Sequence, residues 1–524
     1  MPETESTEVR RGRLAKRARQ SERLVRSAHC WRSVEPAVKE RYTPTEKETC
    51  PMSTRGLLVL LAMGMACGGG PPSSQPERPN IVFIMVDDMG WADLGSYGSK
   101  AIHTPNLDRL ATEGMRFTDA YAGHTVCAPS RCALMTGKHT GNTTVRDNAG
   151  TAPIRDADVT IAEVLKRGGY ATGGFGKWGL GVMGSPGAAE KQGFDTFFGY
   201  YHQVHAHTYY PPFLVEDGKP FLLPGNAEIY GLEPEEFSED TASLNAYKQL
   251  SPKGPFVPRA TPKGEYEFSH ELVFERTLDF IRENRDRPFF CYAPWTPPHS
   301  FYHLPDDDPA VDLYRDKPWS DRAKVHAAFV SMADRHVGEL VELLGELGIA
   351  DQTVVLFMSD NGASNRFEGE LDSSGPLRGA KRSMHDGGIR SPLIAYWPGK
   401  IAVGVVTDHV TYTPDMMPTL AELTGTEDFV PEDIDGISLV PTLLGNAAAQ
   451  QRHEYLYWEW DRGGLQRAVR HGRWKLVADG QGTWQVFDLE TDLSESNNLA
   501  SEHQDLIANA EEWIAANRTA HSGH

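Results

Sequence analysis

The sequence predicts an α/β fold: a large mixed, mostly parallel sheet sandwiched by helices, with a small antiparallel α+β subdomain at the C-terminal end. Two observations lead to this prediction. Short apolar, β-branched runs alternate with helical stretches along most of the 524 residues, and such alternation favours parallel strands joined by helices. After Gly445 the alternation gives way to short strand-like runs joined by tight turns, which is typical of an antiparallel meander.

The strands and helices of the larger part can be placed in chain order. Five apolar runs have the length of buried strands, and they cover residues 80–86, 170–175, 288–293, 353–358 and 392–397. Four further stretches have helical character, and they cover residues 104–114, 160–167, 320–347 and 414–423. At the first of these, Thr104 and Pro105 suit an N-cap and a first helical turn.

Two regions stand apart from this alternation. Residues 211–270 are rich in Pro, Gly and acidic residues, and we interpret them as an insertion that shapes access to a substrate. The C-terminal meander is predicted from strands at 455–460, 467–470, 474–477 and 484–489, followed by a helix at 504–516. We therefore predict a catalytic domain over residues 79–445 and a C-terminal subdomain over residues 446–524.

The N-terminal region has the pattern of an export signal. In residues 52–67 a basic residue, Arg55, precedes an apolar stretch that is too short to span a membrane and ends at Cys67. Residues 68–78 are a linker rich in Gly, Pro and Ser. A cysteine in this position resembles a bacterial lipoprotein signal, although Gly64 stands where such signals usually carry Leu. We expect an exported protein, periplasmic or extracellular, whose contact with a membrane is a lipid anchor at Cys67.

Residues 1–51 carry twelve Lys or Arg and eight Asp or Glu. We interpret them as a mispredicted extension before a start at Met52, or else as a disordered basic arm. The whole chain has a net charge of −20, and such acidity argues against nucleic acid as a partner. After Cys67 the chain has only three cysteines, Cys127, Cys132 and Cys291, so the cysteine count does not identify a redox compartment.

Oxygen-bearing side chains follow two of the predicted strands. Asp87 and Asp88 come directly after the first, and Asp360 and Asn361 come directly after the fourth. Open α/β sheets bind ligands at the carboxyl ends of their strands. Carboxylates and a carboxamide are hard ligands that suit Ca²⁺ better than Mg²⁺. The alternative is that both motifs are only turns that end a strand.

The segment between these motifs carries the sequence Cys127-Ala128-Pro129-Ser130-Arg131, which resembles the signature of the type I sulfatases. Other segments resemble further sulfatase motifs in the same order along the chain: Gly176-Lys177-Trp178, Pro297-Pro298-His299, and the stretch from Leu377 to Pro392 that contains Lys381. The resemblance covers about residues 78–517 and implies the alkaline-phosphatase-like fold. We also expect a helix after Ser130, over residues 132–137, whose N-terminus would favour an anion.

The resemblance implies a mechanism. A maturation enzyme oxidises the cysteine to formylglycine, whose hydrate has one hydroxyl that binds the metal and attacks sulfur and another that later expels sulfate. By this resemblance the metal ligands are Asp87, Asp88, Cys127, Asp360 and Asn361. Of the other site residues, Arg131 holds the formylglycine, Lys177 and Lys381 grip sulfate oxygens, and His299 binds sulfate and protonates the leaving oxygen, which offsets the charge that develops there.

One position departs from the family pattern. The family usually reads Gly-Lys-Trp-His, whereas this chain has Gly179 as the fourth residue. We expect a substitute for this histidine from His205 or His207; the alternatives are that their loop lines the substrate pocket or lies on the surface. His139 and Arg146, with Lys138, are further candidates for the substrate pocket.

The expected activity is hydrolysis of a sulfuric ester. Trp295, Tyr209 and Tyr210 would suit a sugar ring, so a sulfated carbohydrate or other sulfated small molecule is the expected substrate, with ordinary core packing as the alternative for these aromatic residues. Two other functions stay open: a phosphomonoester or phosphonate hydrolase of the same superfamily, and a non-catalytic lipoprotein that binds sulfated glycans.

Overall fold

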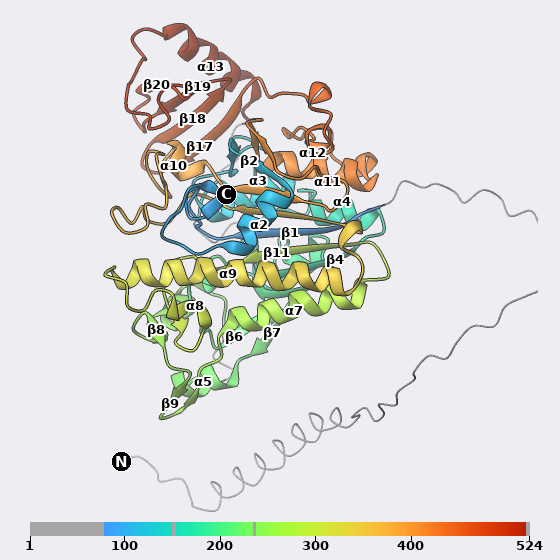
Figure 1. Cartoon of the computed structure of the whole chain (residues 1–524), viewed down its shortest axis with the longest axis vertical. Coiled ribbons are helices and arrows are strands. Elements are labelled where there is room, and N and C mark those ends of the chain that lie inside the picture. The colour runs from blue at the N-terminus through green and yellow to red at the C-terminus, as the bar shows by residue number, and fades with distance from the viewer. Residues whose placement is uncertain (1–77, 149–152, 234–236, 520–524) are drawn as a thin grey trace, which may run out of the picture. The chain divides into compact units, whose positions relative to one another are not determined.

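The computed structural model describes residues 78–148, 153–233 and 237–519, and its centre is a ten-stranded sheet (Figure 1). The strand order is β15-β2-β14-β13-β1-β11-β4-β5-β6-β7. The five central strands, from β13 to β5, run parallel, and both outer parts contain antiparallel pairs. The predicted mixed, mostly parallel sheet is therefore confirmed. In chain order the strands are β1 (Asn80–Val86), β2 (Met115–Phe117), β4 (Ala171–Lys177), β5 (Thr196–Tyr200), β6 (Phe213–Glu216), β7 (Lys219–Leu222), β11 (Phe289–Trp295), β13 (Thr353–Ser359), β14 (Leu393–Tyr396) and β15 (Val405–Thr407).

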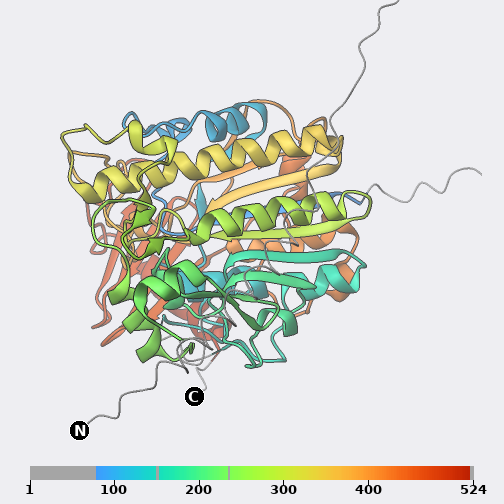
Figure 2. The same ribbon diagram turned by 90° about the horizontal axis from the view of Figure 1, so that it is seen from below.

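Helices cover both faces of this sheet. Figure 2 shows the two longest, α7 (Ser269–Asn284) and α9 (Asp321–Glu346), side by side on one face, where α2 (Pro105–Glu113) joins them. The other face packs against α3 (Cys127–Thr136), α4 (Ile161–Arg167) and α11 (Met416–Thr424). Alternate side chains of β1 enter the two cores, with Val82, Ile84 and Val86 on one side and Ile81, Phe83 and Met85 on the other, as the two-residue period of a strand requires.

The C-terminal meander is also confirmed. β17 (Leu456–Asp461), β18 (Leu465–His471), β19 (Trp474–Ala478) and β20 (Trp484–Asp488) form an antiparallel sheet. One face of this sheet packs against α13 (Gln504–Asn517). The other face shares a core with Tyr121, Ile389 and Tyr412 of the larger part.

Residues 211–270 contribute more regular structure than their composition predicts. β6 and β7 extend the large sheet, and the rest forms two helices and three short strands: α5 (Pro224–Tyr230), α6 (Thr241–Leu250), β8 (Phe256–Val257), β9 (Ala260–Thr261) and β10 (Gly264–Glu265). The remaining short elements are β3 (Ala120–Tyr121), β12 (Leu304–Pro305), β16 (Thr411–Tyr412), α8 (Pro309–Asp312), α10 (Asp386–Ile389) and α12 (Val440–Leu443).

The helix expected over residues 132–137 begins five residues earlier, at Cys127. The side chain of Asn148 explains part of this difference, because its Oδ1 accepts a hydrogen bond from the backbone N–H of Ala128 at 2.9 Å and so satisfies a donor of the first turn. The expected signal peptide, linker and lipid-anchor cysteine lie outside the described residues. Within the described ranges, no helix combines the length and the apolar character needed to cross a membrane.

Candidate active site

Two parallel strands bring the four predicted oxygen ligands together. β1 and β13 are neighbours with Val86 opposite Ser359, so the residues that follow them, Asp87-Asp88 and Asp360-Asn361, lie at one edge of the sheet. All four are fully buried. Asp88 has a φ of +67°, and this left-handed turn lets its backbone N–H donate to Asp360 Oδ1 at 3.2 Å, while Asn361 Nδ2 donates to Asp88 Oδ1 at 2.7 Å.

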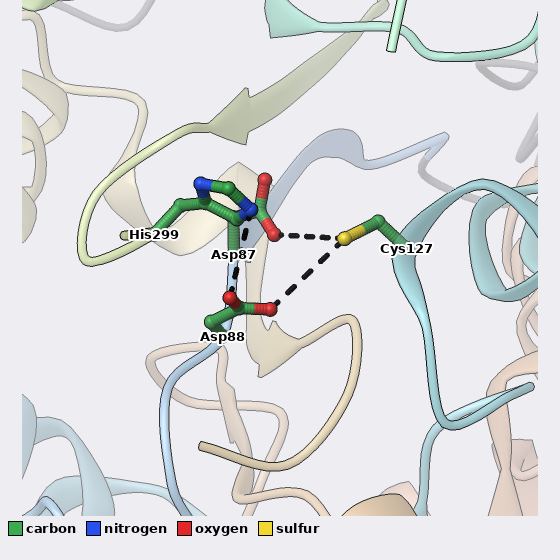
Figure 3. A group of neighbouring side chains, drawn as sticks. All are labelled: Asp87, Asp88, Cys127 and His299. Atoms are coloured by element: carbon green, nitrogen blue, oxygen red, sulfur yellow. Dashed lines mark hydrogen bonds and ion pairs between the residues drawn. The ribbon is translucent and has the colours of Figure 1, made fainter. Parts of the chain in front are cut away.

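Cys127 faces these carboxylates from the first turn of α3 (Figure 3). Its Sγ lies 3.2 Å from Asp87 Oδ1 and 4.0 Å from Asp88 Oδ1. Burial, and then the charge of Asp87, raises the pKa of the thiol to about 12. The start of a helix carries partial positive charge from its unpaired N–H groups, so this position favours an anion beside residue 127.

Arg131, one helical turn further along α3, is fully buried and joins three parts of the site. Its Nε and Nη2 both donate to Asp360 Oδ2, at 3.0 and 2.8 Å. Its Nη1 donates to the backbone oxygen of Lys177 at 2.6 Å. This arginine therefore fixes α3 to the ends of β13 and β4.

Lysine side chains from two separate segments complete the charge balance. Lys177 Nζ donates to Asp87 Oδ2 at 2.6 Å. Lys381 Nζ donates to Asp88 Oδ1 at 2.5 Å and lies 3.1 Å from Cys127 Sγ. Burial would raise the pKa of the Asp87 carboxyl, but the nearby cations, Lys177 foremost, hold this pKa well below its usual value. We call the following residues the floor of the site: Asp87, Asp88, Cys127, Arg131, Lys177, Asp360, Asn361 and Lys381.

The floor fits a divalent cation. Asn361 Oδ1 and Asp88 Oδ2 are buried without a hydrogen-bond partner, which is costly unless a ligand uses them. Ligand atoms of Asp87, Asp88, Cys127 and His299 lie within 4.8 Å of one another (Figure 3). The oxygens of Asp87, Asp88, Asp360 and Asn361 belong to the types that Ca²⁺ prefers.

His299 and His207 stand beside the floor with their rings stacked, 4.6 Å between centroids. His299 Nε2 lies 3.6 Å from Asp88 Oδ2, and Nδ1 lies 2.8 Å from the carbonyl oxygen of Ser300. Burial lowers the pKa of His299 to about 4. Burial and the neighbouring His299 also hold the pKa of His207 well below its usual value. Both rings are therefore neutral near pH 7 before an anion binds.

The two candidate substitutes for the missing histidine lie in different places. His207 lines the pocket above the floor, whereas His205 packs against Tyr200 and Phe213. A Cβ at Gly179 would lie 3.0 Å from Oε1 of Gln203 and 3.7 Å from Cδ of Arg131, so the Gln203 side chain occupies the space beside this glycine. Gln203 is buried, and neither atom of its amide has a hydrogen-bond partner.

Other candidates lie away from the pocket. Arg146 forms an ion pair with Glu459 of the C-terminal sheet at 2.9 Å, and His139 packs against Tyr457 and Trp513. Lys138 pairs with Asp433. The ring nitrogens of His139 are also engaged, because Nδ1 accepts from the N–H of Gly141 and Nε2 lies 3.6 Å from Asp435 Oδ1. None of these three side chains lines the pocket, whereas Asn148, two residues after Arg146, does.

The aromatic residues expected at the mouth belong to the core. Trp295, Tyr209 and Tyr210 are fully buried, and Tyr209 supports the site from below by donating its hydroxyl to the carbonyl oxygen of His299 at 3.0 Å. The aromatic side chains that line the pocket are Phe301 and Tyr302. The pocket has a volume of about 430 Å³. In the sequence, the only sign that Phe301 and Tyr302 belong to it is that they follow closely after the Pro297-Pro298-His299 segment.

Comparison with known proteins decides the family. The model of the family described as Sulfatase matches residues 79–426. The chain belongs to the sulfatase family. A second model, N-sulphoglucosamine sulphohydrolase, C-terminal, matches residues 379–519 of this sulfatase. Human arylsulfatase A is 34% identical over 447 residues, 82% of this chain and 79% of that protein.

Mouse N-acetylgalactosamine-6-sulfatase is 32% identical over 474 residues, 86% of this chain and 81% of that protein. Among solved structures, Ps i-CgsB in complex with k-i-k-neocarrahexaose has a TM-score of 0.69 and 27% identity, over 85% of this chain and 94% of that one. These relatives identify the protein as an enzyme that hydrolyses sulfuric esters, and the expected family and enzyme class are confirmed.

Proposed function

We propose that this sulfatase cleaves sulfate esters of carbohydrates with a formylglycine made from Cys127 and a bound Ca²⁺. The observation that carries the proposal is the position of Cys127. Its Sγ lies between Asp87 and Lys381, at 3.2 and 3.1 Å, at the start of a helix. A nucleophile on this carbon would therefore lie between oxygen ligands for a cation and an ammonium group for the sulfate.

The charges of the floor support this assignment. Three carboxylates, of Asp87, Asp88 and Asp360, balance the charges of Arg131, Lys177 and Lys381. A sulfate ester carries one negative charge, so a bound divalent cation would leave one positive charge at the site, which an ionised hydroxyl on residue 127 would offset. When bound, the cation supplies positive charge beside the sulfate and favours the ionised form of a nearby hydroxyl.

The remaining roles follow from where each side chain lies. Lys177 and Lys381 donate hydrogen bonds to sulfate oxygens, which replace part of their hydrogen bonding to Asp87 and Asp88. Arg131, tied to Asp360 and to the end of β4, keeps the first turn of α3 in place. His299 lies on the pocket side, where the ester oxygen would leave. An anionic ester beside the ring raises the pKa of His299, so a proton is gained on binding and then donated to the leaving alcohol.

The proposed substrate class rests on the pocket and on the relatives. A pocket of about 430 Å³ lined by polar side chains, Phe301 and Tyr302 has the size and chemistry for a sugar ring. Two relatives act on or bind sugars by their names, N-acetylgalactosamine-6-sulfatase and the complex with k-i-k-neocarrahexaose. The proposal includes export of the protein and a lipid anchor at Cys67, because sulfated polysaccharides are found outside the cell.

The deciding experiment is mass spectrometry of the tryptic peptide Phe117–Arg131 from protein made in its native host. We expect an aldehyde at position 127, and loss of turnover of a sulfated sugar in Cys127→Ala. Chelation should abolish the activity, and Ca²⁺ should restore it better than Mg²⁺. An unmodified thiol in fully active protein would contradict the proposal. Faster hydrolysis of a matching phosphate or phosphonate ester would favour the other hydrolase class, and tight glycan binding without turnover by aldehyde-bearing protein would favour the binding lipoprotein.

A further inference from the structure

The pocket above the floor carries more positive charge than one sulfate group needs. Besides Lys381, which is paired with Asp88, three cations line it: Lys248, Arg322 and Arg382. We call these three the rim. They come from separate segments, α6, the first turn of α9 and the loop after Lys381, so the fold brings them together around one opening.

The rim cations lack the carboxylate partners that charged side chains usually have, and Arg322 instead lies 6.0 Å from the centroid of the Tyr302 ring. Among the described residues, none of the three forms an ion pair with a carboxylate, although the protein has 72 acidic residues and a net charge of −20. Lys248 Nζ makes a hydrogen bond of 3.2 Å to Asn245 Oδ1 and lies 4.8 Å above the ring of Phe301. Burial lowers the pKa of Lys248, because its ammonium group has lost water without gaining an anion.

A second cavity adjoins the rim. It has a volume of about 340 Å³ and shares Ser300, Phe301, Tyr302 and Arg322 with the reaction pocket. Pro255 adds apolar surface to it, and Asp321 is the acidic residue in its lining. Phe301 has a φ of +82°, a strained conformation for this residue type that typically persists where function needs it, and here its ring lies where the two cavities meet.

We propose that the rim is a second anion site that binds a further anionic substituent of the sulfated molecule, one that is not cleaved. This inference rests on the proposed function and narrows its substrate class to molecules with at least two negative groups. Guanidinium groups match carboxylate and sulfate oxygens in geometry and charge, so the second group is a sulfate on the same sugar or a carboxylate on the adjoining one. The apolar cavity beside Arg322 receives that adjoining ring.

The first test measures binding to Cys127→Ala protein by calorimetry. The probes are N-acetylgalactosamine 6-sulfate, its 4,6-disulfate, and the 6-sulfate linked to a uronic acid. We expect one or both dianionic probes to bind at least about ten-fold more tightly than the monoanion, the gain typical of charge-assisted hydrogen bonds. A preference for the disulfate identifies sulfate as the second group, and a preference for the uronic acid probe identifies carboxylate.

Variants of the rim then locate the preference. The double variant that combines Arg322→Ala and Arg382→Ala should reduce the ratio of affinities for the dianionic and monoanionic probes at least five-fold. The single variant Lys248→Ala should have an effect of the same size. The matched control is Arg285→Ala, which removes an exposed arginine between α7 and β11, at the opposite end of the strands. Equal affinity for all probes, or a preference that survives in the rim variants, would overturn the inference.

Turnover of 4-nitrophenyl sulfate, which has no second anion, separates this inference from the proposed function. The Cys127 enzyme should release sulfate from it whether or not the rim selects a second anion, because this substrate offers no further anionic group for Lys248, Arg322 or Arg382 to bind. Absence of sulfate release from both 4-nitrophenyl sulfate and the sulfated sugars would refute the proposed function, and the binding measurements would still decide whether the rim selects a second anion.

Discussion

The floor and the rim of the same pocket are organised in opposite ways. In the floor every charge is paired inside the protein: Arg131 with Asp360, Lys177 with Asp87, Lys381 with Asp88. In the rim, Arg322 and Arg382 are exposed and have no carboxylate partner among the described residues. Because the charged groups of the floor are already held in place, they need little reorientation when the reaction begins. The rim cations have no such carboxylate partner in the described part of the chain, and an anionic group of the substrate would supply one. Substrates with this group would therefore bind more tightly than substrates without it.

The largest expected effect separates the chemistry of the floor from recognition at the rim. His299→Ala should lower kcat for a sulfated sugar by about 10²-fold or more, as loss of a general acid does. The loss should be much smaller for 4-nitrophenyl sulfate, because nitrophenolate leaves without a proton. Steady-state kinetics with both substrates provides the measurement.

The rim variant Arg322→Ala serves as the control for His299→Ala. It should alter KM for a dianionic sugar and leave kcat for 4-nitrophenyl sulfate within about two-fold, since it touches no reacting atom. An equal loss with both leaving groups in His299→Ala would show that this histidine positions sulfate and does not donate a proton.

The second prediction concerns Glu239, a buried carboxylic acid at the start of the helix that carries the rim residue Lys248. Glu239 directly precedes the N-cap of α6, the helix that carries Lys248, and its carboxylate accepts a hydrogen bond from the N–H of Met183 at 2.7 Å. Burial raises the pKa of Glu239 from 4.5 to about 7. The folded protein therefore binds a proton that the unfolded chain releases at lower pH, and this stabilisation is complete below about pH 4.5 and is lost as the pH rises through 7.

Glu239→Gln imitates the protonated side chain and should remove this pH dependence. Relative to the parent, the variant should be equally stable at pH 4 and more stable at pH 8, by up to about 3 kcal/mol, since each unit of pKa corresponds to about 1.4 kcal/mol. Urea unfolding at the two pH values measures the difference. A constant difference between the two proteins across this pH range would contradict the shifted pKa.

The contrast between floor and rim also explains what the sequence could predict. Asp87, Asp88, Asp360 and Asn361 each follow a buried strand directly, and the position of a residue at the end of a strand follows from local pattern. The start of α3 could not be predicted in this way, because the hydrogen bond that the N–H of Ala128 donates to Asn148 Oδ1 joins residues 20 positions apart.

The rim could not be predicted in the same way. Lys248, Arg322 and Arg382 come from three segments, and no short motif links them. Their meeting depends on how α6 and α9 pack around one opening. His139 and Arg146 illustrate the reverse error: they are close to Cys127 in sequence, yet they contact the C-terminal sheet, whose position relative to α3 is a matter of tertiary packing.

The smallest predicted effect concerns the glycine that replaces the usual histidine. Gln203 fills the space beside Gly179 and next to Arg131, and both atoms of its buried amide lack partners. A buried amide in this state gains a hydrogen bond when a ligand or ordered water arrives, a contribution of about 1–2 kcal/mol. Gln203→Ala should therefore lower kcat by about ten-fold with little change in KM, whereas Gln203→Glu, which places a negative charge in this buried space, should lower it further. If Gln203→Ala loses thermal stability and keeps its kcat, the side chain only fills space. Gly179 has a φ of +77°, which strains any side chain placed there. Rescue of kcat in Gln203→Ala by Gly179→His in spite of this strain would show that the amide and the family's histidine perform the same task from two different loops.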